Sequence, residues 1–72
     1  MSKYDNNKMQ STGHYDRNRR AVRSCSFVTV ENSARMGQVF WSSTFLRWEI
    51  HFPGGSVEPL NRYGARDLLV KG

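Results

Sequence analysis

One stretch near the middle of the chain alternates between apolar and polar side chains over seven residues. The apolar positions are Leu46, Trp48, Ile50 and Phe52, and the polar positions between them are Arg47, Glu49 and His51. Because successive side chains of a β-strand point to opposite faces, a period of two predicts a strand with one apolar and one polar face. We therefore expect residues 46–52 to form a strand whose apolar face lies on the core.

Two flanking segments are expected to pair with this strand. Residues 25–30 are short, β-branched and contain an aromatic residue, which is typical of a strand. The Pro-Gly-Gly sequence at residues 53–55 predicts a tight turn, because proline fixes φ at the second turn position and glycine accepts a positive φ at the third. Residues 56–58 would return antiparallel until Pro59, which has no N–H to continue the ladder. Together these segments predict a three-stranded antiparallel sheet.

The sequence leaves two neighbouring segments open. For residues 31–38 we favour a loop with a turn, and the alternative is one helical turn from Ser33 to Met36 with Ser33 as its N-cap. Residues 39–41 either extend the strand at 46–52 backward, with a bend or bulge at residues 42–44, or form a separate strand.

The C-terminal residues predict a short helix. Asn61 is a suitable N-cap for a helix over residues 62–70. Its apolar face would be formed by Ala65, Leu68 and Leu69. Gly64 weakens the helix by about 1 kcal/mol relative to alanine. The expected fold class is thus α+β: a small three-stranded antiparallel sheet with a short C-terminal helix packed over its apolar face.

The N-terminal part has a different character. Residues 1–22 are rich in Asn, Ser, Lys, Arg, Asp and Gly and show no apolar periodicity, so they are predicted to be disordered until a partner is bound. Six of the eleven Lys and Arg residues, but only two of the six Asp and Glu residues, lie in residues 1–26. We therefore divide the chain into a disordered basic arm, residues 1–22, and a small α+β binding module, residues 23–72.

Length and composition exclude several classes of protein. Seventy-two residues suffice for one domain, and the single cysteine, Cys25, cannot form an internal disulfide. No apolar run approaches the ~20 residues of a membrane span, and the N-terminus lacks the apolar region of a signal peptide. We therefore expect no membrane association and a location in a reducing cytoplasm.

No motif points to catalysis, a metal or a cofactor. One cysteine and two histidines, His14 and His51, are too few for a structural zinc site, and no C-x₂-C or H-x₃-H spacing occurs. A thiol–imidazole pair is not indicated, because His14 falls in the arm and Cys25 in a strand. The carboxylates show no paired spacing. We predict that the chain is not an enzyme and that it binds no metal and no cofactor.

Arginines and aromatic residues are the best candidates for partner contact. The basic cluster could follow phosphates or dock on an acidic surface, and the alternative is a solvated charge run. The aromatic rings exceed what one helix can cover, so part of the set is expected on an exposed face, and the alternative is that nearly all are core. The expected contact residues are Arg17, Arg19, Arg20 and Arg23 in the arm, and Arg47 with Trp41 or Phe45 on the module.

A basic arm through Arg23 followed by a sheet that carries residues 46–52 resembles the layout of the small regulators that lytic bacteriophages make, among them a Xanthomonas-phage inhibitor of host RNA polymerase. The resemblance implies a transcription regulator that contacts the large polymerase subunits, inhibits initiation through loss of the σ factor and favours antitermination. Such a protein would act in the host bacterial cytoplasm, be monomeric when free and contact nucleic acid weakly and non-specifically. The alternative is a small single-stranded nucleic-acid-binding protein, whose aromatic rings stack on bases while the arm follows the backbone.

Overall fold

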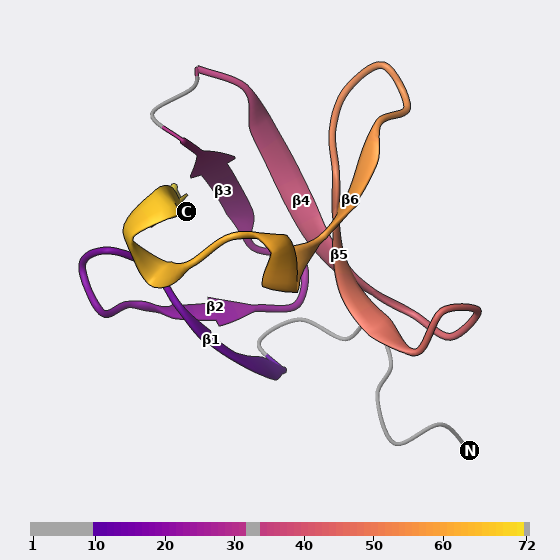
Figure 1. Ribbon diagram of the computed structural model, residues 1–72, viewed down its shortest axis with the longest axis horizontal. Helices are drawn as coiled ribbons and strands as arrows, with labels where there is room; N and C mark the ends of the chain where they lie inside the picture. Colours follow the sequence, from indigo (N-terminus) through magenta and orange to yellow (C-terminus); the bar gives the residue numbers. More distant parts are fainter. Residues whose placement is uncertain (1–9, 32–33, 72) are drawn as a thin grey trace.

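The computed structural model describes residues 10–31 and 34–71 (Figure 1). In these residues the chain forms seven β-strands and two short 3₁₀ helices, and no α-helix. The strands are β1 (Ser11–Tyr15), β2 (Ala21–Arg23), β3 (Phe27–Val30), β4 (Met36–Ser42), β5 (Arg47–His51), β6 (Val57–Pro59) and β7 (Leu68–Val70), and the 3₁₀ helices are η1 (Leu60–Arg62) and η2 (Ala65–Asp67). The predicted α+β fold class is therefore wrong, since the described part is mostly β.

The strands form two antiparallel sheets. β1 and β2 make a two-stranded sheet, and the other five strands make a sheet in the order β6-β5-β4-β3-β7. The last strand crosses back to pair with β3. This crossing brings the C-terminal segment, yellow in Figure 1, next to the β1–β2 hairpin, to which it is hydrogen-bonded.

The alternating stretch lies inside the larger sheet, as predicted. β5 is flanked by β4 and β6, and Trp48, Ile50 and Phe52 are buried. Leu46 is the exception, because it is 73% exposed and belongs to the preceding turn. The rest of the core is formed by Val22, Val28, Val30, Val39, Leu60, Tyr63 and Leu68.

Residues 39–41 belong to a separate strand, β4, which decides between the two alternatives. A turn at residues 43–46 joins β4 to β5. The loop predicted at residues 31–38 is shorter than expected, because β4 begins at Met36 and pairs with β3 from there. Ser33, the N-cap of the helical alternative, lies outside the described residues.

The turn predicted at residues 53–55 is confirmed. The N–H of Gly55 donates to the C=O of Phe52 (3.2 Å), and Gly54 has a φ of 92°, which glycine adopts without steric cost. β6 then returns antiparallel to β5 and ends at Pro59. The three predicted strands are thus present as β3, β5 and β6, but β4 lies between β3 and β5, and β7 adds a fifth strand.

The helix predicted over residues 62–70 is absent. η1 and η2 are separated by Gly64, whose backbone is extended (φ −81°, ψ 170°), and β7 follows. No side chain caps η1, and Asn61, the predicted N-cap, lies within it. Short helices are only marginally stable without strong packing, whereas a Leu-Leu-Val segment has a high propensity for strands. Residues 68–70 therefore pair with β3 instead of forming a helix.

The arm predicted to be disordered is folded wherever the structure describes it. β1 and β2 form a hairpin, and Val22 on β2 is completely buried in the core. The turn of this hairpin contacts β7, because the N–H of Arg17 donates to the C=O of Leu68 (3.0 Å). The prediction of disorder is therefore wrong for residues 10–22, and residues 1–9 lie outside the described residues.

Candidate partner-binding surface

Three of the predicted contact arginines are displayed by the turn of the β1–β2 hairpin. We call residues 17–20 the basic loop, in which Arg17, Arg19 and Arg20 are all exposed. The turn is closed by its own backbone: the N–H of Asp16 donates to the C=O of Arg20 (2.9 Å), and the N–H of Arg19 donates to the C=O of Asp16 (3.0 Å). A closed turn keeps the three arginines together at the surface.

The side chain of Asp16 fastens the basic loop to the last strand. Its Oδ1 accepts the N–H groups of Asn18 (2.9 Å) and Arg20 (2.8 Å), and its Oδ2 accepts the N–H of Val70 (2.9 Å). Burial raises the pKa of this carboxyl, but the N–H donors of Val70, Arg20 and Asn18, together with the charge of Arg20, outweigh burial and hold the pKa below its ordinary value. The carboxylate is therefore ionised at neutral pH and fixes the loop on β7.

The fourth predicted arginine is separated from the other three. Arg23 is half-buried at the far end of β2, where it lies opposite Ser11, and its N–H donates to the hydroxyl of Ser26 (3.2 Å). The structure thus divides the predicted cluster into the basic loop and one arginine at the open end of the hairpin.

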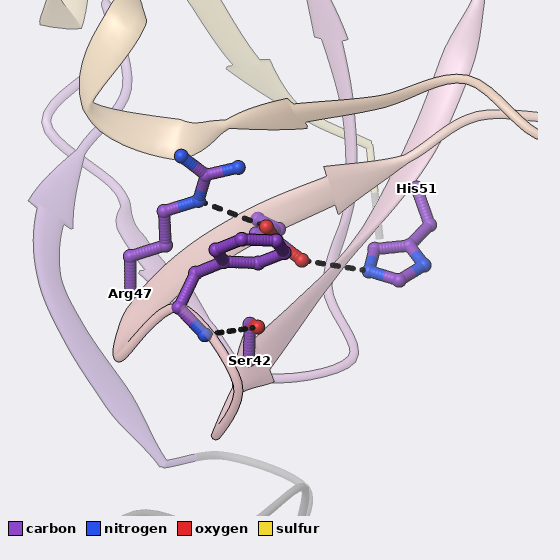
Figure 2. A network of polar contacts seen from close by, with 5 residues as sticks. Ser42, Arg47 and His51 are labelled. Atoms are coloured by element: carbon purple, nitrogen blue, oxygen red, sulfur yellow. Dashed lines mark hydrogen bonds and ion pairs between the residues drawn. The ribbon is translucent and has the colours of Figure 1, made fainter.

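The turn between β4 and β5 exposes two adjacent apolar side chains, Phe45 and Leu46, which we call the apolar tip. Phe45 is 65% exposed and Leu46 is 73% exposed. The N–H of Phe45 donates to Oγ of Ser42 (3.1 Å), and the guanidinium carbon of Arg47 lies 4.9 Å from the centroid of the Phe45 ring (Figure 2). Two predicted contact residues, Phe45 and Arg47, therefore lie side by side.

Arg47 is also held by a carboxylate on its own strand. Its Nε lies 2.8 Å from Oε2 of Glu49, and Nε2 of His51 lies 3.6 Å from Oε1 of the same group (Figure 2). Glu49 is buried, although it belongs to the polar face of β5. Phe40, its partner on β4, packs edge-on against the His51 ring at 5.2 Å. The polar face is thus partly covered, and its three polar side chains form a fixed row.

A pocket of about 220 Å³ lies beside the apolar tip. Its lining residues are His14, Trp41, Leu46, Arg47, Trp48 and Asn61. The rings of Trp41 and Trp48 meet edge-on across β4 and β5, with centroids 5.3 Å apart and planes at 69°. Trp41, a predicted contact residue, therefore forms a wall of this pocket. The sequence did not identify His14 or Asn61 as site residues, because one falls in the predicted arm and the other at the predicted helix cap.

The basic loop and the apolar tip lie at opposite ends of the molecule. Figure 1, drawn with the longest axis horizontal, places the β1–β2 turn at one end and the β4–β5 turn at the other. The longest extent is 36 Å. Within residues 10–31 and 34–71, no group of three or more His, Cys, Asp or Glu residues could hold a metal ion. The basic loop and the apolar tip are therefore two separate features of the surface in this part of the chain.

Comparison of the chain with known protein families, with curated proteins and with solved structures finds no significant match. In the part of the chain that the structure describes, the helices are η1 and η2, and neither is long and apolar enough to cross a membrane. Function is therefore inferred from the surface itself.

Proposed function

We propose that this chain is a non-catalytic binding protein that docks on a protein partner through the apolar tip and Arg47. The observation that supports this is the exposed pair of Phe45 and Leu46 at the end of a turn braced by Ser42 and Arg47. Aromatic and arginine side chains are enriched among the residues that dominate protein interfaces, and adjacent exposed apolar groups mark interaction sites.

The backbone of the apolar tip supports the same proposal. Leu46 has a φ of 54°, in the left-handed region, which costs a residue other than glycine roughly 1–2 kcal/mol. Its side chain is mostly exposed, so little of this cost is offset by burial within the protein. Residues that are strained in this way gather at functional sites. We infer that the Leu46 side chain contributes more to partner binding than to the stability of the fold.

The proposed partner is bacterial RNA polymerase, contacted on its large subunits in the cytoplasm of a host bacterium. Binding there would inhibit initiation through loss of the σ factor and would favour antitermination. Support comes from the resemblance in size, charge and layout to small phage regulators, and from the net charge of +5, which favours an acidic partner. The basic loop would supply a second contact, and a folded loop loses less conformational entropy on binding than a disordered arm.

The test is the affinity of the purified chain for purified bacterial RNA polymerase, measured by interferometry with the chain immobilised. The double variant Phe45→Ser/Leu46→Ser removes the apolar tip and should weaken binding at least about tenfold, as expected for central interface residues. The matched control is Met36→Ser/Val57→Ser, which removes two other exposed apolar side chains and should change affinity less than about twofold. Equal affinities for the two variants, or no complex with polymerase, would reject the proposal.

A second candidate function, binding of single-stranded nucleic acid, is favoured by one observation, the aromatic pocket formed by Trp41 and Trp48. Aromatic walls next to cationic side chains suit bases and phosphates. Capture from a bacterial lysate with and without nuclease separates the two candidates. Loss of every captured component after nuclease treatment would favour nucleic acid as the main target.

A further inference from the structure

We propose that the pocket beside the apolar tip is a binding site for a single nucleobase. The pocket lies where three parts of the chain meet: β1 contributes His14, η1 contributes Asn61, and the β4–β5 hairpin contributes both tryptophans. The inference goes beyond the proposed docking on a protein. The pocket shares Leu46 and Arg47 with the docking surface, but His14, Asn61 and Trp48 belong to the pocket alone, so variants of these residues test the pocket separately.

The size and the walls of the pocket suit one aromatic ring system. A volume of about 220 Å³ is below the roughly 300–1,000 Å³ of sites for drug-sized ligands and suits a ligand of the size of a base. Trp41 and Trp48 contact each other edge-on, and Trp48 is buried whereas Trp41 is half-buried, so a base would stack on the open part of the Trp41 ring. Stacking of this kind is how single-stranded bases are held by many proteins.

The polar groups of the pocket suit the edge of a base. A base edge carries hydrogen-bond donors and acceptors side by side, and a carboxamide matches both at once. Asn61 offers such a carboxamide: it does not cap η1, and its side chain has no hydrogen-bond partner among the described residues. His14 adds an imidazole to the lining. Asn61 is exposed, so its carboxamide is accessible to a ligand.

The charge around the pocket suits the phosphates that accompany a base in a strand. β1 carries His14 at the pocket and leads within two residues into Asp16, after which the basic loop begins. A strand of nucleic acid whose base occupies the pocket would follow β1 away from the apolar tip to reach Arg17, Arg19 and Arg20. Hydrogen bonds of Asp16 and Arg17 to β7 hold this loop on the larger sheet. The ligand chemistry is that of a nucleobase, from either a free nucleotide or a strand.

Tryptophan fluorescence of the full chain reports on this site directly, because the chain has two tryptophans and both line the pocket. Titration with oligo(U) and oligo(A) should quench this fluorescence. A parallel titration uses uridine and adenosine monophosphates. Each carries one phosphate and lacks the neighbouring phosphates of a strand that reach the basic loop, so quenching should require a much higher concentration. Heparin, a polyanion without bases, should bind without comparable quenching. If the mononucleotides quench as tightly as the oligonucleotides, the source of the base is a free nucleotide.

The variant that tests the base edge is Asn61→Ala, and the control is Ser56→Ala, an exposed polar side chain between β5 and β6 that lines neither the pocket nor the basic loop. Asn61→Ala should weaken oligonucleotide binding about tenfold, the size of effect that one good contact to a base edge gives, and Ser56→Ala should not change it. His14→Ala provides a second pocket variant. Identical oligonucleotide affinities for all three variants, binding without quenching, or quenching by heparin equal to that by oligonucleotides would overturn the proposal. Polymerase affinity should be unchanged in Asn61→Ala, so failure of this site and failure of the docking proposal give different results.

Discussion

The carboxylate of Asp16 joins two parts of the chain that are 54 residues apart in the sequence. One oxygen closes the basic loop on itself, and the other accepts the N–H of Val70 at the edge of the larger sheet. Asp16 is 1% exposed, and the three hydrogen bonds that its carboxylate accepts from Asn18, Arg20 and Val70 all come from backbone N–H groups. A charged acceptor is thus required at this position, and not only a polar one.

Asp16→Asn should lower the free energy of unfolding by about 1–3 kcal/mol at pH 7, because the amide replaces an acceptor oxygen with an N–H₂ group that faces N–H donors. Urea denaturation followed by circular dichroism measures this change. Glu31→Gln is the matched control, since it makes the same chemical change at an exposed position and should stay within about 0.5 kcal/mol of the unchanged chain. Equal stability of the two variants would show that the charge of Asp16 does not matter.

The same carboxyl should make stability depend on pH. Its pKa is lower in the folded state than in the unfolded state, so its contribution to stability is fully present above the unfolded pKa of about 3.9 and is lost as the pH falls through the folded pKa. The urea midpoint of the unchanged chain should therefore decrease as the pH is lowered from about 5 toward 2. In Asp16→Asn this decrease should be smaller. A steeper decrease in the variant would contradict the assignment.

Leu46→Gly should leave the free energy of unfolding unchanged or raise it by up to about 1.5 kcal/mol. The substitution relieves roughly 1–2 kcal/mol of left-handed strain, and the greater freedom of glycine in the unfolded chain offsets roughly 0.5–1 kcal/mol of that gain. Thermal denaturation measures the outcome, and Phe45→Gly, at a position without a positive φ, should be destabilising instead. If Leu46→Gly lowered the free energy of unfolding by more than about 1 kcal/mol, the Leu46 side chain would be shown to stabilise the fold.

At the scale of elements, the sequence predicts best where burial and periodicity coincide. β5 is predicted correctly because Trp48 and Ile50 are buried on one face, and the Pro-Gly-Gly turn is predicted correctly because Gly54 takes a positive φ. β7 is missed because a three-residue apolar strand is too short to show a period of two. Once the ladder with β3 is available, pairing outweighs the weak helical tendency of a segment interrupted by Gly64.

The β1–β2 hairpin is missed for a different reason. Its strands are polar, and Val22 is its one completely buried apolar residue, so the sequence contains no apolar pattern that indicates order. The hairpin is held instead by hydrogen bonds to the backbone and by Asp16, and neither has a sequence period. For the same reason the pocket is not predicted: His14 lies on β1 and Asn61 in η1, which packs against β5, and the two line one pocket although they are far apart in the sequence.

The order of the hairpin can be measured by amide hydrogen exchange in the free chain. The amides of Asp16, Arg17 and Arg20 donate hydrogen bonds and should be protected at least about tenfold more strongly than the amide of Gly54 in the exposed turn. In Asp16→Asn, the protection of Arg20 should fall. Exchange of Asp16, Arg17 and Arg20 at random-coil rates would show that the segment is disordered when free.

At the scale of the whole molecule, the two proposed contacts differ in chemistry and lie at opposite ends of the long axis, as Figure 1 shows for the two turns. The apolar tip offers burial of apolar surface, and the basic loop offers charge. Apolar contacts chiefly determine how slowly a complex dissociates, whereas surface charge chiefly determines how fast it forms. A rigid protein that carries both is expected to show the two effects separately.

Replacing Arg17, Arg19 and Arg20 with serine should therefore slow association with RNA polymerase by about tenfold at low salt. The fold should remain intact, within about 0.5 kcal/mol, because the loop is held by its backbone and by Asp16 and the three side chains are exposed. Stopped-flow or interferometry rates at several salt concentrations measure the effect, which should shrink as salt screens the charges.

The matched control replaces Arg62, Arg66 and Lys71 with serine, which removes the same charge from exposed positions outside the loop. If the basic loop contacts the partner, the loop variant should also dissociate faster, and the control should change only the association rate, by less than the loop variant does. The apolar-tip variant should show the reverse pattern, with faster dissociation and nearly unchanged association. Equal rates for the two charge variants would mean that the net charge of the molecule attracts the partner and that the basic loop makes no contact of its own.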